Sequence, residues 1–412
     1  MKRRMLALVA LLAVLLTACA KGDDQQTVTG VTEPDQTGTE EKNEEISQED
    51  VTKPEDVTSI EQEVLSPVAS VRMELNRSDV TDDDGTVLCY GNLTRPEVFI
   101  EGGEVAAAAI NDVLMAQAAE RHAAVQSAAQ QAKTDRPLLE ETGGFNGYSV
   151  SDLVTVARLD GKTVSLLWSA SDNLGGAHDS TLTTAWVFDV ATGDRLGLKD
   201  VTGDYDALAQ LLTERVAAEI SAAPDRYFSQ AAEQIPQLLE TGSWYFSDQG
   251  LVLLAPPELL APYAAGTLEF TVSYADLEEL LDQQWMPAEA VDSQGEPQIA
   301  LQTDDGAPAA TMAVQADDSG AEMVLWTDGV LEDFRIWRVT SSDGVTWYRG
   351  GCCYAADRLE EGQAVGLTAM LPDVMTNVMI SYTADGETVY RGIGESGKDG
   401  SVFFLELDTV ID

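Results

Sequence analysis

The sequence predicts an α+β fold, with helices packed on an antiparallel sheet, followed by a smaller all-β domain of the sandwich type. Three observations predict it. Strand-like alternation is interrupted by one long Ala-rich helical segment, hairpins and two amphipathic helices come next, and short β runs fill the last part of the chain. We expect the α+β domain at residues 67–282, a polar linker at 283–296 and the β domain at 297–412.

Residues 1–19 are typical of a bacterial lipoprotein signal peptide. Lys2, Arg3 and Arg4 precede an apolar run of about a dozen residues, which is shorter than the ~20 needed to span a bilayer. The run ends in Leu16-Thr-Ala-Cys19, which resembles a lipobox. Cleavage would make Cys19 the first residue, and a diacylglycerol on its sulfur would anchor the chain lastingly. We expect an extracytoplasmic protein, lipid-anchored to the cell membrane of a bacterium; a plain secretory signal is the alternative.

Residues 20–66 are predicted to form a disordered acidic tether. The stretch 21–66 holds 14 acidic and 3 basic residues, contains no aromatic residue and shows no apolar periodicity. Such a composition cannot bury enough apolar surface to offset the entropy lost on folding. A flexible chain of this length reaches about 35–40 Å, which would hold the folded part away from the membrane.

The charge of the chain restricts its partners. The sequence has 71 acidic and 24 basic residues, a formal net charge of −47, and about −39 of that charge falls on residues 67–412. This surface repels nucleic acid and anionic lipid and attracts cationic proteins or divalent ions, within a Debye length of ~8 Å at physiological salt. We expect no nucleic-acid partner and a basic protein partner, with solubility alone as the alternative.

Residues 68–156 are expected to give strands, then a helix, then strands. Val71 to Leu75 alternates as a strand, and Asp82-Asp-Asp-Gly85 is a turn signal. Apolar residues at helical spacing predict a long helix from Glu104 to Lys133, which ends before Arg136-Pro137. The Asp run lacks the spacing of a calcium loop, so turn chemistry is favoured there.

Residues 148–281 show paired strands followed by helices. An Asp160-Gly161 turn predicts one hairpin, and Ala191-Thr-Gly-Asp194 predicts the turn of another. Helical spacing of apolar residues predicts helices from Tyr205 to Ser221 and from Arg226 to Leu239, the second with a kink at Pro236.

Several ordered blocks of this part resemble a known family. The blocks are Asp172-Asn-Leu-Gly-Gly-Ala-His-Asp179, Phe188-Asp-Val-Ala-Thr-Gly-Asp-Arg-Leu-Gly-Leu-Lys-Asp200, Gly250-Leu-Val-Leu-Leu254 and Ala261-Pro-Tyr-Ala-Ala-Gly266, ahead of Phe270 and Tyr274. They are similar to the extracytoplasmic domain shared by RsiV, the lysozyme-sensing anti-sigma factor, and PdaC, a peptidoglycan deacetylase. The likeness covers about residues 68–281. It implies a binding domain, since RsiV captures lysozyme with it and PdaC places catalysis in a separate domain.

The first block is the candidate ligand-binding loop. Its residues of interest are Asp172, Asn173, Gly175, Gly176, His178 and Asp179. Glycines permit close backbone approach, and an imidazole flanked by carboxylates can hydrogen-bond a partner. The alternative for His178 is that it pins its own loop by donating to a backbone carbonyl. The other histidine, His122, is expected on a helix surface or in packing.

No catalytic, metal or cofactor motif is found. His122 and His178 lie far apart, and there is no Cys-x-x-Cys, so neither a structural zinc site nor the paired histidines of a metal-dependent deacetylase is expected. Four residues precede the apolar run, so no sigma-binding segment is expected either. Ser-x-x-Lys, Gly-x-Ser-x-Gly and phosphate-cradling loops are lacking. The sequence predicts a non-enzymatic binding or sensing protein; a wall-acting carbohydrate hydrolase with a carboxylate pair and a purely structural envelope lipoprotein are the alternatives.

The last part combines a β pattern with two adjacent cysteines. Short runs from Ile299 to Leu407 recur about every ten residues between Asp-Gly and Ser-Gly turns, which predicts a sandwich. Its aromatic residues, Trp326, Trp337, Trp347 and Tyr348, are expected in the core, with a sugar-stacking platform as the alternative. Cys352 and Cys353 have Cα atoms about 3.8 Å apart, too close for an ordinary disulfide, so these residues and Cys89 are expected as buried free thiols.

Overall fold

The computed structural model describes residues 68–411, except 143, 288–298, 304–306, 318, 372–375, 385, 397–400 and 408. The predicted signal peptide with Cys19, the tether and most of the linker lie outside the described residues. The α+β class is confirmed: helices accompany a large mixed sheet, and two smaller sheets are present. Within the described residues, no helix combines the length and apolarity that crossing a membrane requires.

A sheet of twelve described strands organises the chain. Its order is β18-β17-β16-β13-β14-β1-β3-β4-β5-β6, with β2 beside β3 and β19 beside β14. The strands from the first half are β1 (Ala69–Arg77), β2 (Val80–Thr81), β3 (Val87–Ile100), β4 (Tyr148–Leu159), β5 (Thr163–Asn173) and β6 (Ser180–Asp189). Those from the last part are β13 (Leu331–Thr340), β14 (Thr346–Leu359), β16 (Val378–Ala384), β17 (Glu387–Glu395), β18 (Val402–Glu406) and β19 (Thr409–Ile411).

Strands of the two predicted domains pair directly with each other. β1 runs antiparallel to β3 on one side and antiparallel to β14 on the other, where Ser70, Val71 and Arg72 lie opposite Ala356, Ala355 and Tyr354. The core on one face of this sheet contains Val71 and Val154 together with Trp337 and Trp347. The boundaries 67–282 and 297–412 stay a prediction, but both segments contribute to one sheet and one core.

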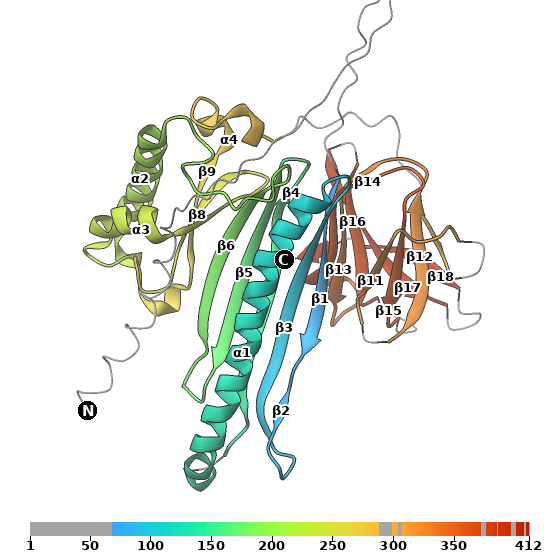
Figure 1. Ribbon diagram of the computed structural model, residues 1–412, viewed down its shortest axis with the longest axis horizontal. Coiled ribbons are helices and arrows are strands. Elements are labelled where there is room, and N and C mark those ends of the chain that lie inside the picture. The colour runs from blue at the N-terminus through green and yellow to red at the C-terminus, as the bar shows by residue number, and fades with distance from the viewer. Residues whose placement is uncertain are drawn as a thin grey trace, which may run out of the picture. The chain divides into compact units, whose positions relative to one another are not determined.

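Helix α1 (Glu104–Thr142) covers β3 and β4 on one face of this sheet (Figure 1). Its Ile110, Leu114 and Val125 are fully buried, as the helical spacing predicted. The predicted end before Arg136-Pro137 is wrong, because the helix continues through Pro137. Pro137 has no N–H and therefore removes one backbone hydrogen bond of the helix. Arg136 forms ion pairs with Glu140, one helical turn later, and with Asp84 of the β2–β3 loop, and these contacts stabilise the helix at this point.

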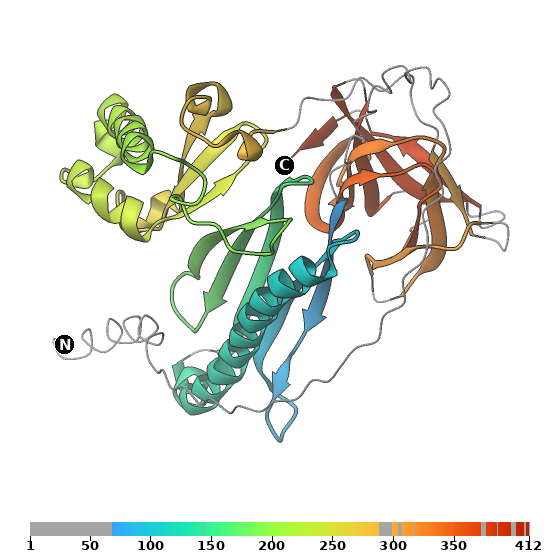
Figure 2. The same cartoon turned by 45° about the horizontal axis from the view of Figure 1, so that its top comes forward.

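A smaller unit follows β6. It is a sheet of β7 (Ser243–Phe246), β8 (Gly250–Ala255) and β9 (Leu268–Ser273), with helices α2 (Tyr205–Ala222), α3 (Ile235–Thr241) and α4 (Tyr274–Leu277) (Figures 1 and 2). Its core includes Leu212, Leu238 and Phe270, and it continues onto Ala185 and Val187 of β6. The predicted single helix from Arg226 to Leu239 is wrong. Two 3₁₀ turns (Pro224–Arg226 and Ala231–Gln234) precede α3, which starts where Pro236 fits the first helical turn.

The last part of the chain forms two packed β-sheets, as in the predicted sandwich. A sheet ordered β10 (Ile299–Gln302), β12 (Ala321–Thr327), β15 (Ala364–Ala369) and β11 (Met312–Gln315) packs on the large sheet. Leu325 and Leu367 from the smaller sheet meet Phe334, Ile336 and Ile380 from the larger one. This is the face-to-face packing of a sandwich.

The expected core packing is confirmed for two of the four aromatic residues of this part, while Trp326 is only partly buried. Trp337 and Trp347 are buried in the core beneath α1, whereas Tyr348 is exposed. Successive side chains of a strand point to opposite faces. Accordingly, Cys352 packs in the core on the α1 side and Cys353 packs in the core of the sandwich. Cys89, Cys352 and Cys353 are buried free thiols, as expected.

A buried charged junction, made of Arg158, Asp160, Arg335 and Asp357, lies where the small unit meets the large sheet. Arg158 donates to the Tyr274 hydroxyl at 2.7 Å and to the Trp285 carbonyl at 2.8 Å, and it pairs with Asp160. Arg335 donates to the Val156 carbonyl at 2.7 Å. Burial, and then the nearby Asp160 carboxylate, raise the pKa of Asp357 to about 7. The junction therefore holds charge in a poorly solvated place.

Candidate functional site

The candidate loop, residues 172–179, is the tip of the β5–β6 hairpin. The two strands pair along their length up to Asp172 opposite Ser180, so the turn brings all six predicted residues onto one short segment. Residues 174–179 are exposed, as is Leu182 on the following strand. The hairpin therefore presents the loop to solvent.

Hydrogen bonds within the loop fix its shape. Asn173 donates from Nδ2 to Asp179 Oδ1 at 2.7 Å, and Ser171 donates to Asp179 Oδ2 at 3.2 Å. The Gly175 N–H donates to Asn173 Oδ1 at 3.1 Å, which is an Asx-type turn. Both oxygens of Asp179 thus hold the loop together, and Asn173 bridges its two sides.

The two glycines differ in what they permit. Gly175 has φ +78°, and a Cβ there would lie 2.8 Å from the Tyr148 ring. Gly176 does not have a φ in the left-handed region, and a Cβ there would lie 3.4 Å from its nearest neighbour, the His178 carbonyl oxygen. Only Gly175 is therefore required by the conformation and by the close approach to Tyr148.

His178 makes the contact described by the loop-pinning alternative. Its Nδ1 lies 3.0 Å from the Asp179 carbonyl oxygen, and its ring stacks on Tyr263 with centroids 4.7 Å apart. Tyr263 donates its hydroxyl to the same carbonyl at 2.5 Å and accepts the Thr181 N–H at 3.1 Å. His178 nevertheless stays exposed. Tyr263 belongs to the last of the resembling blocks, so the fold brings two of these blocks into contact.

An arginine from α1 anchors the base of the loop. Arg121 contacts Asp172 through Nη2 at 2.5 Å and Nη1 at 3.2 Å, and contacts Asp152 of β4 through Nε at 2.6 Å. The Asp152 side chain is fully buried, and burial raises its pKa although the Arg121 guanidinium acts in the opposite direction. This triad joins α1, β4 and β5 directly beneath the loop.

Sequence reasoning missed this triad. Arg121 stands seven residues after Leu114 and four before Val125, both fully buried, so it falls on the apolar face of its helix. A charged residue in that position is a signal for a buried partner. The partners Asp152 and Asp172 lie on other elements, and nothing local in the sequence indicates them.

The other candidates have simpler environments. His122 is exposed on α1, with Nδ1 3.4 Å from the Ser78 hydroxyl. The Asp run forms the predicted turn, in which Gly85 N–H donates to the Asp82 carbonyl at 3.0 Å. Lys133 of α1 bonds the Asp82 carboxylate at 2.7 Å. Across the described ranges, no group of three or more His, Cys, Asp or Glu residues is placed to hold a metal ion.

In chemical terms, the loop exposes both polar and apolar groups to solvent. It offers an imidazole, carboxylate oxygens and the apolar side chains of Leu174 and Leu182, all exposed on a hairpin that its base and its Tyr263 contact hold in place. Such a surface suits hydrogen bonds and ion pairs with a partner.

Comparison with known proteins gives a family for part of the chain. Residues 199–275 match the family described as "Protein of unknown function (DUF3298)", so the chain contains a DUF3298 domain. The match runs from the loop after β6 to the first turn of α4. The match falls inside the region that resembles the RsiV and PdaC extracytoplasmic domain. It supports that resemblance only as far as membership of the DUF3298 family. No curated protein matches the chain.

Two solved structures are similar. A DUF3298-family member from Bacteroides fragilis NCTC 9343 is 16% identical, with a TM-score of 0.41 over 52% of this chain and 94% of that one. A DUF3298-family protein from Pseudomonas aeruginosa PAO1 is 14% identical, with a TM-score of 0.34 over 53% of this chain and 98% of that one.

Proposed function

We propose that this chain is a lipid-anchored extracytoplasmic binding or sensing protein that acts without chemical change of its ligand. The proposed ligand is a cationic protein of the lysozyme type or a cell-wall fragment, and the proposed contact surface is the candidate loop. The observation that carries the proposal is the combination of exposure and fixation in this loop. Residues 174–179 face solvent, while Asp172 and Asp179 are each held by a partner from another element.

Fixation matters because ordering a loop on binding costs free energy. Each rotamer-rich side chain that is immobilised on binding costs roughly 0.5–1.5 kcal/mol. In this loop the ordering is already present in the free protein, through the Arg121 ion pair and the stack of His178 on Tyr263. A partner would therefore meet a surface that needs little rearrangement.

The charge of the folded part supports a cationic partner. About −39 on residues 67–412 would raise the encounter rate with a basic protein, and this steering weakens as salt screens it. The resemblance of the 172–179 block to the lysozyme-capturing domain supports the same ligand class. The two lines of support are independent, since one rests on the total charge and the other on a local motif.

The anchor is tested at Cys19. We expect Cys19→Ala to abolish incorporation of labelled fatty acid in a bacterial host and to leave precursor uncleaved or processed elsewhere. The unsubstituted chain is the positive control. Fatty-acid labelling of the variant would contradict the lipobox interpretation and leave the plain secretory signal as the explanation.

The ligand is tested by binding kinetics with lysozyme and with soluble peptidoglycan fragments at low salt. We expect saturable binding to at least one of them. His178→Ala should act mainly on the off-rate, because it removes a loop contact. The distal variant Glu322→Lys/Glu387→Lys, with both residues exposed on strands of the last part, should act mainly on the on-rate.

Two outcomes would overturn the proposal. Absence of saturable binding to both probes at low salt would favour a structural envelope lipoprotein. Release of new reducing ends from peptidoglycan by the purified chain would favour the hydrolase alternative.

A further inference from the structure

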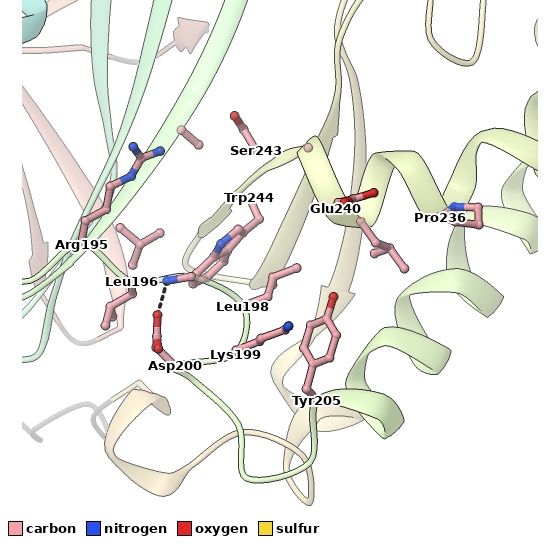
Figure 3. A pocket seen from close by; sticks show the side chains of 15 residues that line it. Arg195, Leu196, Leu198, Lys199, Asp200, Tyr205, Pro236, Glu240, Ser243 and Trp244 are labelled. Carbon is pink, nitrogen blue, oxygen red and sulfur yellow. Dashed lines mark hydrogen bonds between the residues drawn. The ribbon is translucent and has the colours of Figure 1, made fainter. Parts of the chain in front are cut away.

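A cavity lies away from the candidate loop, where the smaller unit of β7–β9 and α2–α4 meets β6. Its volume is about 840 Å³, within the range of small-molecule pockets. Figure 3 shows its walls: the segment from Arg195 to Asp200 on one side, and α3 with the start of β7 on the other. Most of its lining belongs to the DUF3298 match at residues 199–275.

Two cations line this cavity without a carboxylate partner. The Arg195 guanidinium lies 5.6 Å from the Trp186 ring centroid, and the Lys199 ammonium lies 4.9 Å from that of Tyr205. A ring face holds a cation but leaves its N–H donors free. In the described part of the chain, neither side chain makes a hydrogen bond or an ion pair. Both residues are exposed, and desolvation by the surrounding protein atoms lowers the pKa of Arg195.

Arg195 and Lys199 share this lack of an ion pair with other exposed cations of the described chain, such as Arg77, Arg215 and Arg226, whereas the partly buried Arg72 and Arg391 pair with Glu97 and Glu406. Arg195 and Lys199 differ from those other exposed cations in that both line one cavity together with apolar side chains. Their N–H donors are therefore available to a ligand in that cavity.

The remaining walls are mainly apolar. Val187 and Trp244 are buried core residues that reach the cavity, and Leu239 lines it from α3. The Asp200 carboxylate is engaged locally, since it accepts the Gly197 N–H at 2.7 Å (Figure 3). Glu240 is the second carboxylate of the lining, at the end of α3.

We propose that this cavity binds an amphipathic anion. Its apolar body would lie on Val187, Leu239 and Trp244. A carboxylate or phosphate head would take the planar fork of the Arg195 guanidinium, which matches either group with two parallel hydrogen bonds. Lys199 would add a second positive charge. The site shares no residue with the candidate loop, so it goes beyond the proposed function and does not depend on it.

The test is isothermal titration calorimetry of the mature chain at low ionic strength, with three probes below their micellar concentrations. These are decanoate, decyl phosphate and the uncharged decanol. We expect saturable binding of at least one anion, at least about tenfold tighter than decanol. A preference between the two anions assigns the head group as carboxylate or phosphate. Equal affinity for decanol, or no binding of either anion, would overturn the proposal.

Variants separate the site from nonspecific charge effects. Arg195→Gln should weaken binding of the preferred anion about tenfold or more, and Lys199→Gln should weaken it several-fold. Glu240→Gln should strengthen it, because a repulsive carboxylate is removed. Arg215→Gln, an exposed cation of α2 outside the cavity, is the matched control and should change nothing.

Unchanged affinity in Arg195→Gln, with an unchanged melting temperature, would also overturn the proposal. His178→Ala should leave anion binding intact. Because His178 belongs to the candidate loop and does not line the cavity, this variant distinguishes a failure of loop binding from a failure of anion binding.

Discussion

Val71 of β1 lies opposite Ala355 of β14 in an antiparallel ladder, and both side chains are buried in the core beneath α1. The pair joins a strand near the start of the described chain to one in its last part. Cutting the chain between the two segments would leave this ladder and its shared core intact. The covalent linker is then only one of the connections between them.

We therefore expect a nicked chain to stay together. A protease recognition sequence inserted within residues 288–298 should allow complete cleavage, while the two fragments elute as one particle in size-exclusion chromatography. They should separate only in denaturant, because the β1–β14 ladder and the shared core hold them. Elution as two particles under native conditions would contradict this and support independent domains.

The sequence predicts the elements of this fold better than their partners. The Asp160-Gly161 hairpin and the helix beginning at Tyr205 follow from local periodicity and turn residues, and the structure contains both. The β1–β14 pairing could not be predicted in this way. Alternation shows that a strand has a buried face, but it does not indicate which distant strand lies beside it.

The candidate site shows the same difference between local features, which the sequence predicts, and long-range contacts, which it does not. Residues 172–179 are contiguous, so a hairpin was enough to bring them together. Arg121, Asp152 and Asp172 come from three elements. Arg195 forms a backbone bridge with Phe188 of β6, and the cavity that it lines is completed by α3 and β7. Only the position of Arg121 on an apolar helix face was visible in the sequence.

The Arg121 triad should dominate the stability of the loop region. Arg121→Met should lower the free energy of unfolding by about 3–5 kcal/mol, because it leaves the fully buried Asp152 carboxylate without its counter-ion. Asp172→Asn should cost only about 1 kcal/mol, since that side chain is partly exposed. Urea unfolding measures both.

A second substitution gives the control for this prediction. Adding Asp152→Leu to Arg121→Met should restore most of the lost stability, because the uncompensated buried charge is gone. Equal losses in the single and double variants would instead point to lost packing of the Arg121 side chain.

Gly175 and Gly176 form a matched pair for testing the loop conformation. Gly175→Ala places a Cβ 2.8 Å from the Tyr148 ring at φ +78°, and should cost about 1–2 kcal/mol or displace the loop. Gly176→Ala should be nearly neutral, since its Cβ meets only ordinary contacts. Thermal unfolding compares the two, and equal melting temperatures would contradict the loop geometry.

The three described cysteines should be unreactive in the folded protein. Burial raises the pKa of Cys352 to about 12 and those of Cys89 and Cys353 to about 11, so the thiolate fraction at pH 8 is small. Iodoacetamide at pH 8 should label them only after denaturation, as read by mass spectrometry. Rapid labelling of Cys353 without denaturant would show that the sandwich core opens.

Asp357 should make the protein less stable as pH rises toward neutrality. Its pKa in the folded state, about 7, lies above the ordinary value of 3.8 because of burial and then the neighbouring Asp160 carboxylate. Between about pH 4 and pH 7 the folded protein keeps a proton that the unfolded chain has lost. Raising the pH through that window therefore lowers the free energy of unfolding.

Asp357→Asn removes this penalty. Its gain in stability over the unsubstituted chain should be near zero at pH 4 and on the order of 4 kcal/mol at pH 8. Asp343→Asn is the control of opposite sign. The pKa of Asp343 is lowered to about 2 by the N–H groups of Thr346 and Val345, so its carboxylate stabilises the fold above pH 4 and that variant should be less stable at pH 8. Chemical unfolding of the three proteins from pH 4 to pH 8 measures these differences, and parallel pH profiles for Asp357→Asn and the unsubstituted chain would show that Asp357 is ionised without cost.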